Sequence, residues 1–250
     1  EIEESFYDTG NCFNYADTFQ VPVIHMMDKF HASSVITCKR FDTEKISIDR
    51  GKLLEKVEDG YRRFEFTDDG ISPRSRLGID NGIFWDTGDE SDETGHITED
   101  PILRVKMMDK RMSRLDLILE RIPKEQQAVS FGVEDFTIIS WGSTIGPVLD
   151  AVDMLKKEGI SIGLVQMKLM HPFPGEYVTS LLQDAKTIID VEANQSGQLA
   201  KLFKQNVNRD VDYFILKYTG RAMTSTEVYD SLKKIVQNKA GKREVLMHGA

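Results

Sequence analysis

The sequence predicts an α/β protein in which a mostly parallel sheet is covered by helices on both faces. In the second half of the chain, short apolar runs without polar alternation are separated by amphipathic stretches of helical length. Strands covered on both faces lack alternation, and a regular succession of strand and helix produces parallel sheets. With 250 residues, 40% of them hydrophobic, the chain is long enough for one large or two ordinary domains.

Residues 1–40 predict the closing helix and strand of an α/β unit. An aromatic-rich amphipathic stretch is followed by the apolar run VPVIHMM at 21–27, which we expect to be a buried strand. His25 lies inside this run. It is interpreted as a hydrogen-bonded core histidine rather than a catalytic one, because no carboxylate partner is fixed nearby in sequence.

Residues 41–131 predict an irregular connection followed by one long helix. The part up to 100 is rich in turn formers and charge, but its apolar residues predict order on a domain surface. A helix is expected between Pro101 and Pro123. Its apolar residues recur at spacings of three and four and are expected to form a packing seam: Val105, Met108, Met112, Leu115, Leu119 and Ile122.

Residues 132–237 carry the strand and helix alternation, and 238–250 are expected to be a frayed tail. The expected strands cover 136–141, 161–166, 187–191 and 212–217. The expected helices cover 146–158, 175–184, 196–207 and 225–237, the last opened by a capping pattern at 224–227.

Charge and hydropathy exclude several classes of partner. The net charge of −9 has the wrong sign for attraction to nucleic acid or to an anionic membrane. No apolar stretch approaches the roughly 20 residues that span a bilayer. We therefore expect a cytoplasmic protein with no nucleic acid and no membrane partner. The missing initiator Met, together with a first element that starts in mid-domain, predicts a fragment of a longer polypeptide.

Cysteine spacing and the acidic residues predict no metal site in this chain. Cys12 and Cys38 stand alone, without a C-x-x-C motif, so this chain is not expected to carry an iron–sulfur cluster by itself. The two cysteines are expected to be buried small hydrophobes rather than a disulfide. The acidic segment that starts at Asp89 has Thr94 and Asp100 where a calcium loop needs Gly and Glu.

The glycine turn from Gly142 to Gly146 does not match the phosphate-binding templates. A P-loop needs a lysine directly after its last glycine, and no basic residue follows until Lys156. A dinucleotide fingerprint needs an acidic residue at the end of the next strand, which ends in Val-Gln-Met at 165–167. The turn is expected to cap its helix and to bind no nucleotide, although a helix N-terminus with free amides can also take an anion.

Six stretches resemble one protein family in the family's own order. DFTIISWGST at 135–144, MKLMHPFP at 167–174 and IDVEANQSGQLA at 189–200 resemble the transketolase C-terminal-like domain in the α subunits of 2-oxoacid:ferredoxin oxidoreductases. Three more stretches resemble the end of that family's pyrimidine-type thiamine domain and its connection: 20–24, 70–78 and 87–100.

The resemblance implies an enzyme that decarboxylates a 2-oxoacid on thiamine diphosphate with magnesium. Electrons then pass through a four-iron four-sulfur cluster to ferredoxin, and the acyl group passes to coenzyme A. In this family the cluster cysteines and the diphosphate motif belong to the β subunit, and the substrate motif Tyr-Pro-Ile-Thr-Pro does not occur here. The resemblance therefore implies no catalytic residue in this chain, which would act as a scaffold and subunit interface. Two alternatives are a transketolase-like domain of a 2-oxoacid dehydrogenase or deoxyxylulose-phosphate synthase, and a noncatalytic interaction module.

Five residues are candidates for the site. Arg74, with Ser72 beside it, is expected either to bind a substrate carboxylate or coenzyme A phosphate through its guanidinium fork, or to form a structural salt bridge. Glu192, Asn194 and Gln195 follow a strand at its carboxyl end, where open α/β sheets bind ligands, and are expected to be ligand or interface residues.

Overall fold

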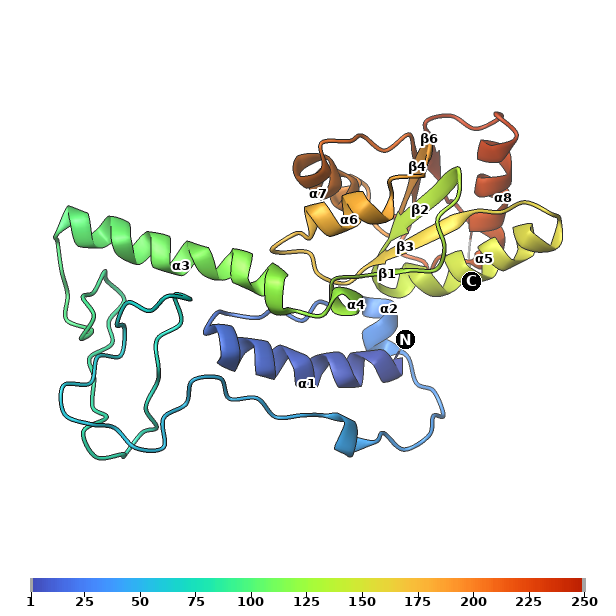
Figure 1. Cartoon of the computed structure of the whole chain (residues 1–250). Helices are drawn as coiled ribbons and strands as arrows, with labels where there is room; N and C mark the ends of the chain where they lie inside the picture. Colours follow the sequence, from blue (N-terminus) through green and yellow to red (C-terminus); the bar gives the residue numbers. More distant parts are fainter. Residues whose placement is uncertain (1, 249–250) are drawn as a thin grey trace. The chain divides into compact units, whose positions relative to one another are not determined.

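The chain folds into two compact units, and Figure 1 traces them in a computed structural model that describes residues 2–248. The first unit combines Met27–Ile36 with residues from 122 onward. The second combines Ile2–Met26 with Thr37–Arg121. Each unit is described by itself.

The first unit is built on a six-stranded sheet in the order β1-β3-β2-β4-β5-β6. Its strands are β1 (Ala128–Ser130), β2 (Phe136–Ser140), β3 (Gly163–Met167), β4 (Thr187–Glu192), β5 (Tyr213–Leu216) and β6 (Arg243–Val245). Only β1 runs antiparallel to its neighbour, so the mostly parallel sheet is confirmed.

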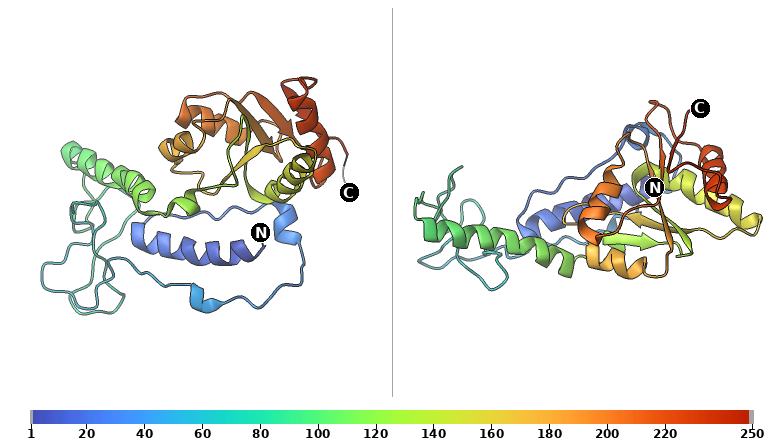
Figure 2. Two further views of the ribbon diagram at one scale, coloured as in Figure 1. Left: turned by 45° about the vertical axis from the view of Figure 1, so that its right-hand side comes forward. Right: turned by 90° about the horizontal axis from the view of Figure 1, so that it is seen from above.

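Helices cover both faces of this sheet, as predicted. On one face α5 (Ile145–Lys157) and α8 (Ser225–Val236) pack against Ile138. On the other face α6 (Gly175–Leu181) and α7 (Gln198–Val207) pack against Ile139. The left view in Figure 2 shows the two helix layers on opposite sides of the strands. Consecutive strand residues point to opposite faces, which explains why the apolar runs do not alternate.

The remaining elements of the first unit are short. They are α2 (Lys29–Ser33), α4 (Lys124–Gln127) and the 3₁₀ turn η2 (Gly142–Thr144). The predicted cap of the last helix is present, because the Thr224 side chain accepts from the Glu227 amide and the Glu227 carboxylate accepts from Thr224.

The second unit contains two long helices and an ordered irregular chain. Its helices are α1 (Ile2–Phe19), α3 (Pro101–Arg121) and the 3₁₀ turn η1 (Thr43–Lys45). The predicted long helix is therefore present, and it ends before Pro123. Ile71 is buried in this unit and anchors the irregular connection, whereas Leu77, Ile83 and Trp85 are exposed.

The run at 21–27 forms no strand, which corrects the prediction. A strand needs a neighbour to complete its backbone ladder, and none of the described strands pairs with this segment. Ile24 is 82% exposed. His25 is not a core residue either, since it is half-buried and its Nδ1 contacts the Thr9 hydroxyl at 3.2 Å.

Three further predictions need correction. The 238–250 segment contains β6, which pairs with β5, and Leu246 is only 5% exposed. In α3 the buried residues are Met107, Lys110 and Ile118, whereas Val105 and Met112 of the expected seam are 59% and 54% exposed. Cys12 is half-buried and Cys38 is exposed, so neither is a buried core residue.

Candidate functional site

The carboxyl ends of β2 and β4 form the switch point of the sheet. These strands are neighbours, yet α5 follows β2 onto one face while α7 follows β4 onto the other. Open α/β sheets bind ligands in the crevice between two such strand ends. Trp141 follows β2 and Glu192 ends β4, so both lie at this point.

Glu192 is fully buried there and accepts hydrogen bonds on both carboxylate oxygens. Its Oε2 accepts from Trp141 Nε1 at 3.2 Å and from Asn194 Nδ2 at 2.6 Å. Its Oε1 accepts from the amides of Leu199 at 2.8 Å and Ala200 at 3.4 Å, in the first turn of α7. The carboxylate therefore takes the place that an external anion takes at other helix N-termini.

The two other residues proposed at this edge differ in their environment. Asn194 joins Glu192 and also closes the loop, because its Oδ1 accepts from the amides of Ser196 and Gly197 at 3.1 and 2.9 Å. Gln195 is exposed, and its backbone oxygen accepts from Arg243 Nη2. The structure thus brings Glu192 and Asn194 together and leaves the Gln195 side chain apart.

Asp190 is a buried acid that the sequence analysis missed. It precedes Glu192 by two residues, on the same side of β4, and neither of its oxygens meets a donor among residues 2–248. A Cβ placed on Gly197 would lie 3.4 Å from its Oδ2. Burial, the charge of Glu192 and the hydrogen bond that protonated Asp190 donates to Glu192 raise the pKa of Asp190 to about 10. Asp190 is therefore a neutral acid at physiological pH.

The glycine turn before α5 is also closed by a carboxylate of the chain itself. Asp28 Oδ2 accepts from the Ser143 amide at 3.1 Å, and its Oδ1 accepts from the His31 amide at 2.8 Å. Burial opposes ionisation, but these hydrogen bonds from Ser143 and His31 still lower the pKa of Asp28. The Thr144 hydroxyl donates to the Trp141 carbonyl at 2.5 Å. Both helix N-termini at this edge are thus occupied internally.

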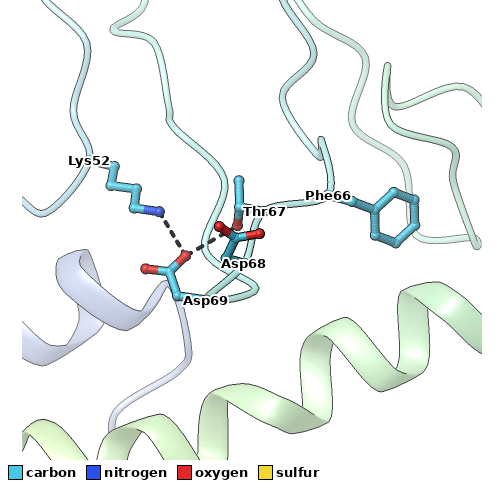
Figure 3. A pocket seen from close by; sticks show the side chains of 5 residues that line it. All are labelled: Lys52, Phe66, Thr67, Asp68 and Asp69. Atoms are coloured by element: carbon cyan, nitrogen blue, oxygen red, sulfur yellow. Dashed lines mark hydrogen bonds and ion pairs between the residues drawn. The ribbon is translucent and has the colours of Figure 1, made fainter.

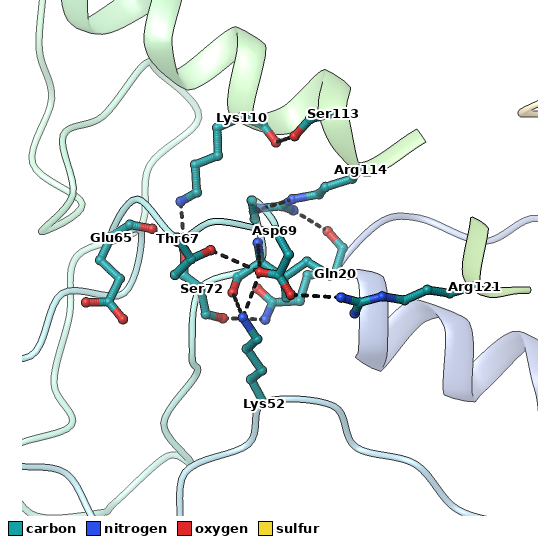
Figure 4. Close-up of polar contacts among 12 residues, drawn as sticks. Gln20, Lys52, Glu65, Thr67, Asp69, Ser72, Lys110, Ser113, Arg114 and Arg121 are labelled. Atoms are coloured by element: carbon teal, nitrogen blue, oxygen red, sulfur yellow. Dashed lines mark hydrogen bonds and ion pairs between the residues drawn. The ribbon is translucent and has the colours of Figure 1, made fainter. Parts of the chain in front are cut away.

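In the second unit, Ser72 is fully buried and its polar atoms are bonded (Figure 4). Its hydroxyl donates to the Glu65 carbonyl at 2.8 Å and accepts from Lys110 Nζ at 2.7 Å. Its backbone oxygen accepts from Gln20 Nε2 at 2.6 Å. These contacts anchor the 69–74 loop to α3 and to the residue after α1.

Arg74 forms the salt bridge that the sequence analysis gave as one of two possibilities. Its Nη2 lies 2.7 Å from Asp17 Oδ1, and Asp17 Oδ2 lies 2.7 Å from Arg50 Nη1. Arg74 Nη2 also donates to the Arg50 carbonyl at 3.3 Å. Its Nε is buried and has no acceptor in the part of the chain that the structure describes. The Nε donor of the Arg74 guanidinium group therefore remains without an acceptor among the described residues.

Asp69 organises the start of this loop and borders an open hollow of about 540 Å³ (Figure 3). Its Oδ1 accepts from Lys52 Nζ at 2.7 Å and from the Ile71 amide at 3.1 Å, and its Oδ2 lies 3.3 Å from Arg121 Nη2. Burial opposes ionisation, but the bonds from Lys52 and Ile71 lower the pKa of Asp69 to about 2. This carboxylate is fully engaged, whereas Asp68, which also lines the hollow, is exposed.

Lys110 is a second buried residue that the sequence analysis missed. Its Nζ donates to the Phe64 carbonyl at 2.6 Å and to Ser72, without a carboxylate partner. Burial, followed by the charges of Arg114 and Arg63, lowers the pKa of Lys110 to about 8. The helical pattern of 101–122 assigned this lysine to a polar face. The helical periodicity of a sequence does not distinguish a lysine that turns inward and binds a neighbouring loop from a lysine that points to solvent.

Two family models match the chain, one after the other. Residues 1–110 match the thiamine diphosphate-binding domain of pyruvate flavodoxin/ferredoxin oxidoreductases, and residues 134–228 match core domain II of pyruvate:ferredoxin oxidoreductase. Together with the α/β fold, these matches define the class as that of thiamine diphosphate-binding ferredoxin oxidoreductases.

Similarity to individual proteins identifies the family within this class. The chain is 42% identical over 251 residues to the α subunit of 2-oxoacid:ferredoxin oxidoreductase 2 of Aeropyrum pernix, covering 99% of this chain and 39% of that protein. It is 39% identical over 251 residues to the α subunit of the 2-oxoacid:ferredoxin oxidoreductase of Saccharolobus solfataricus, covering 98% of this chain and 39% of that protein. The chain belongs to this family of α subunits and spans 39% of the length of these two relatives.

A solved structure agrees with this assignment. The 2-oxoglutarate:ferredoxin oxidoreductase from Magnetococcus marinus, with 2-oxoglutarate, coenzyme A and succinyl-CoA bound, matches with a TM-score of 0.81 at 30% identity. The match covers 90% of this chain and 39% of that one. The family resemblance stated from the sequence is therefore confirmed.

The residues that the structure describes contain neither a metal-binding group nor a membrane-spanning helix. Residues 2–248 contain no group of three His, Cys, Asp or Glu side chains arranged to hold a metal ion. None of the described helices is both long and apolar enough to cross a membrane. We assign no step of thiamine chemistry to the described side chains.

Proposed function

We propose that this chain completes the thiamine domain of an α subunit and forms part of its interface with a β subunit. The observation that carries the proposal is the similarity to 2-oxoacid:ferredoxin oxidoreductase α subunits along 99% of the chain. The proposed enzyme oxidises a 2-oxoacid with coenzyme A to an acyl-CoA and CO₂. The electron pair that decarboxylation releases passes to ferredoxin.

The cofactors and partners follow from the same proposal. Thiamine diphosphate and magnesium are shared with the β subunit, and a four-iron four-sulfur cluster lies in the partner subunit, not in this chain. When bound, thiamine diphosphate supplies the carbanion stabilisation that decarboxylation of a 2-oxoacid requires. The enzyme is proposed to be cytoplasmic, with no nucleic acid and no membrane partner.

Contacts in the first unit favour a scaffold role over ligand binding. The switch point of the sheet is filled by Trp141, Glu192 and Asn194, and the turn before α5 is held by Asp28. A ligand at this edge would have to displace buried carboxylates from their donors, which is costly. We therefore assign Glu192 and Asn194 to holding the loop after β4, which presents the exposed Gln195 to a partner surface. Substrate binding is proposed for Arg74 in the second unit, on the loop that the buried Ser72 anchors.

Purification of the assembled enzyme tests the proposal. The polypeptide that contains this chain is expressed with its β subunit, and the chain carries the affinity tag. The expected result is a brown complex with the absorption of a four-iron cluster and with bound thiamine diphosphate. A colourless complex that holds thiamine diphosphate would favour a dehydrogenase or synthase type. Recovery of the chain without cofactor or β subunit would favour a noncatalytic interaction module.

A further inference from the structure

Arg63 is a half-buried cation without a polar partner in residues 2–248. Its guanidinium lies over the rings of Phe64 and Phe84, with its central carbon 5.0 and 5.8 Å from their centroids. No acceptor or carboxylate of the described chain reaches it, and Asp86 acts on it only from beyond ion-pair distance. Burial, and to a lesser extent the charge of Arg74, lowers the pKa of Arg63, but an arginine remains protonated at physiological pH.

Tyr61 connects Arg63 to Arg74. The Tyr61 hydroxyl donates to the Pro73 carbonyl at 3.1 Å and accepts from the Ser75 amide at 2.9 Å, so it contacts the chain on both sides of Arg74. The Tyr61 ring packs edge-on against Phe84, with 6.4 Å between centroids, and Phe84 is one of the rings under Arg63. Tyr61 therefore links the backbone on both sides of Arg74 to the aromatic group that lies under Arg63.

Arg63 has no carboxylate within ion-pair distance among the described residues, and the charge of Asp86 acts on it only from farther away. Asp17 is the carboxylate paired with Arg74, and it is shared with Arg50. Arg63 adds a third cation, and the buried Nε of Arg74 has no acceptor among the described residues. A partly buried cation without a counter-charge is unfavourable, and a bound anion would offset this cost. Guanidinium groups bind phosphate and carboxylate oxygens through two parallel N–H donors.

We propose that Arg63 and Arg74 form an oxyanion site that receives a phosphate or carboxylate group of a ligand. Which anion it takes rests on the proposed function, under which the group is a phosphate of coenzyme A or a carboxylate of the 2-oxoacid. The sequence analysis named Arg74 alone. Arg63 was missed because the adjacent residues Arg62 and Arg63 look equivalent in sequence. In the structure Arg62 pairs with the Glu93 carboxylate at 3.0 Å, and Arg63 does not.

Calorimetric titration of the polypeptide that contains this chain tests the site. The probes are inorganic phosphate, coenzyme A, its form without the 3′-phosphate, and 2-oxoglutarate. At low ionic strength the unmodified protein is expected to bind at least one of them. Arg63→Gln and Arg74→Gln should each weaken that binding about 10-fold or more, because each removes a charge-assisted bond. A difference between the two forms of coenzyme A identifies its 3′-phosphate as the anion. Preference for 2-oxoglutarate identifies a carboxylate.

The matched control is Arg62→Gln, which removes an adjacent arginine outside the site and should leave affinity unchanged. Thermal unfolding checks that each variant is folded. If Arg63→Gln does not fold, Arg63→Lys replaces it, and binding should be weakened several-fold because lysine lacks the planar fork. The site is refuted if no probe binds, if the Arg63 variant binds normally, or if Arg62→Gln weakens binding equally. Because the readout is binding, a lack of oxidoreductase activity would count against the proposed function alone.

Discussion

Asp190 shows how one buried side chain escapes prediction from sequence. The isoleucines around it predicted the strand correctly, but they gave no indication that an acid would face α7 without a donor. The outcome depends on the Glu192 carboxylate, which is two residues away and already accepts hydrogen bonds on both oxygens. Two such carboxyl groups cannot both ionise when buried together. Lys110 escaped for a related reason, since its acceptors at Phe64 and Ser72 come from a distant segment.

Replacing Asp190 by Asn is expected to stabilise the protein at neutral and alkaline pH. The unfolded chain releases the Asp190 proton near pH 4, whereas the folded chain keeps it to about pH 10. Between these values the unfolded state binds fewer protons, so stability falls as pH rises. Asparagine keeps a donor for Glu192 without titrating. At pH 8 the gain should be roughly 1–3 kcal/mol in urea unfolding, and smaller at pH 5.

The exposed Asp184 provides the control, because Asp184→Asn should change stability little at either pH. Equal destabilisation of Asp190→Asn at pH 5 and pH 8 would show that Asp190 is not a neutral buried acid.

Removing the Glu192 carboxylate should be strongly destabilising. Glu192→Ala leaves the Trp141 indole, the Asn194 amide and the first amides of α7 without their acceptor. The expected loss is about 2–4 kcal/mol. Hydrogen exchange should accelerate in α7 before it accelerates elsewhere in the sheet. Glu134→Ala, at an exposed position, should leave both quantities unchanged. Normal protection of α7 in Glu192→Ala would contradict the capping role.

At the scale of elements, the sequence predicted what periodicity and turn chemistry determine. The four central strands, their helices and the cap at Thr224 were found close to the expected positions. The sequence could not predict which segments pair as strands with segments that are distant along the chain. The 21–27 run has the apolar composition of a strand, but none of the described strands pairs with it. The polar segment β6 is a strand because it pairs with β5.

The connection from β5 to β6 is a second feature of the sheet that the sequence could not predict. α8 lies on the same face as α5, although β6 and β3 lie on opposite sides of β2. This crossing therefore has the opposite hand to the three other helical crossings. The general preference for one hand would not have predicted it.

The 69–74 loop should depend on Gly70 for its contact with α3. Gly70 has a φ of +68°, and a Cβ there would lie 2.8 Å from the Lys110 carbonyl. Gly70→Ala is expected to cost about 2–4 kcal/mol and to expose the 64–74 segment to hydrogen exchange.

Gly78 separates the steric effect from the backbone effect. It has a φ of +80° but nothing within 4 Å of a Cβ, so Gly78→Ala should cost only about 1 kcal/mol. Equal costs for the two substitutions would mean that the loop does not rest on α3 as described.

At the scale of the whole molecule, the two units divide the proposed work. The first unit fills its own ligand-binding edge with Glu192 and Asp28, while the second leaves Arg63 and the Nε of Arg74 without acceptors in the described chain. A scaffold in one unit and an anion site in the other fit an α subunit that shares its chemistry with a partner. The motifs and their order predicted the family, but they could not show which carboxylates close which helix.

The most direct test of the central proposal is the reduction of a viologen dye by the α and β subunits combined. The assay supplies coenzyme A and one of several 2-oxoacids, with omission of coenzyme A or of the β subunit as controls. The account predicts dye reduction and acyl-CoA formation with at least one 2-oxoacid, and neither when the β subunit is omitted. A combined enzyme that is inactive with every 2-oxoacid but converts a sugar phosphate would contradict it.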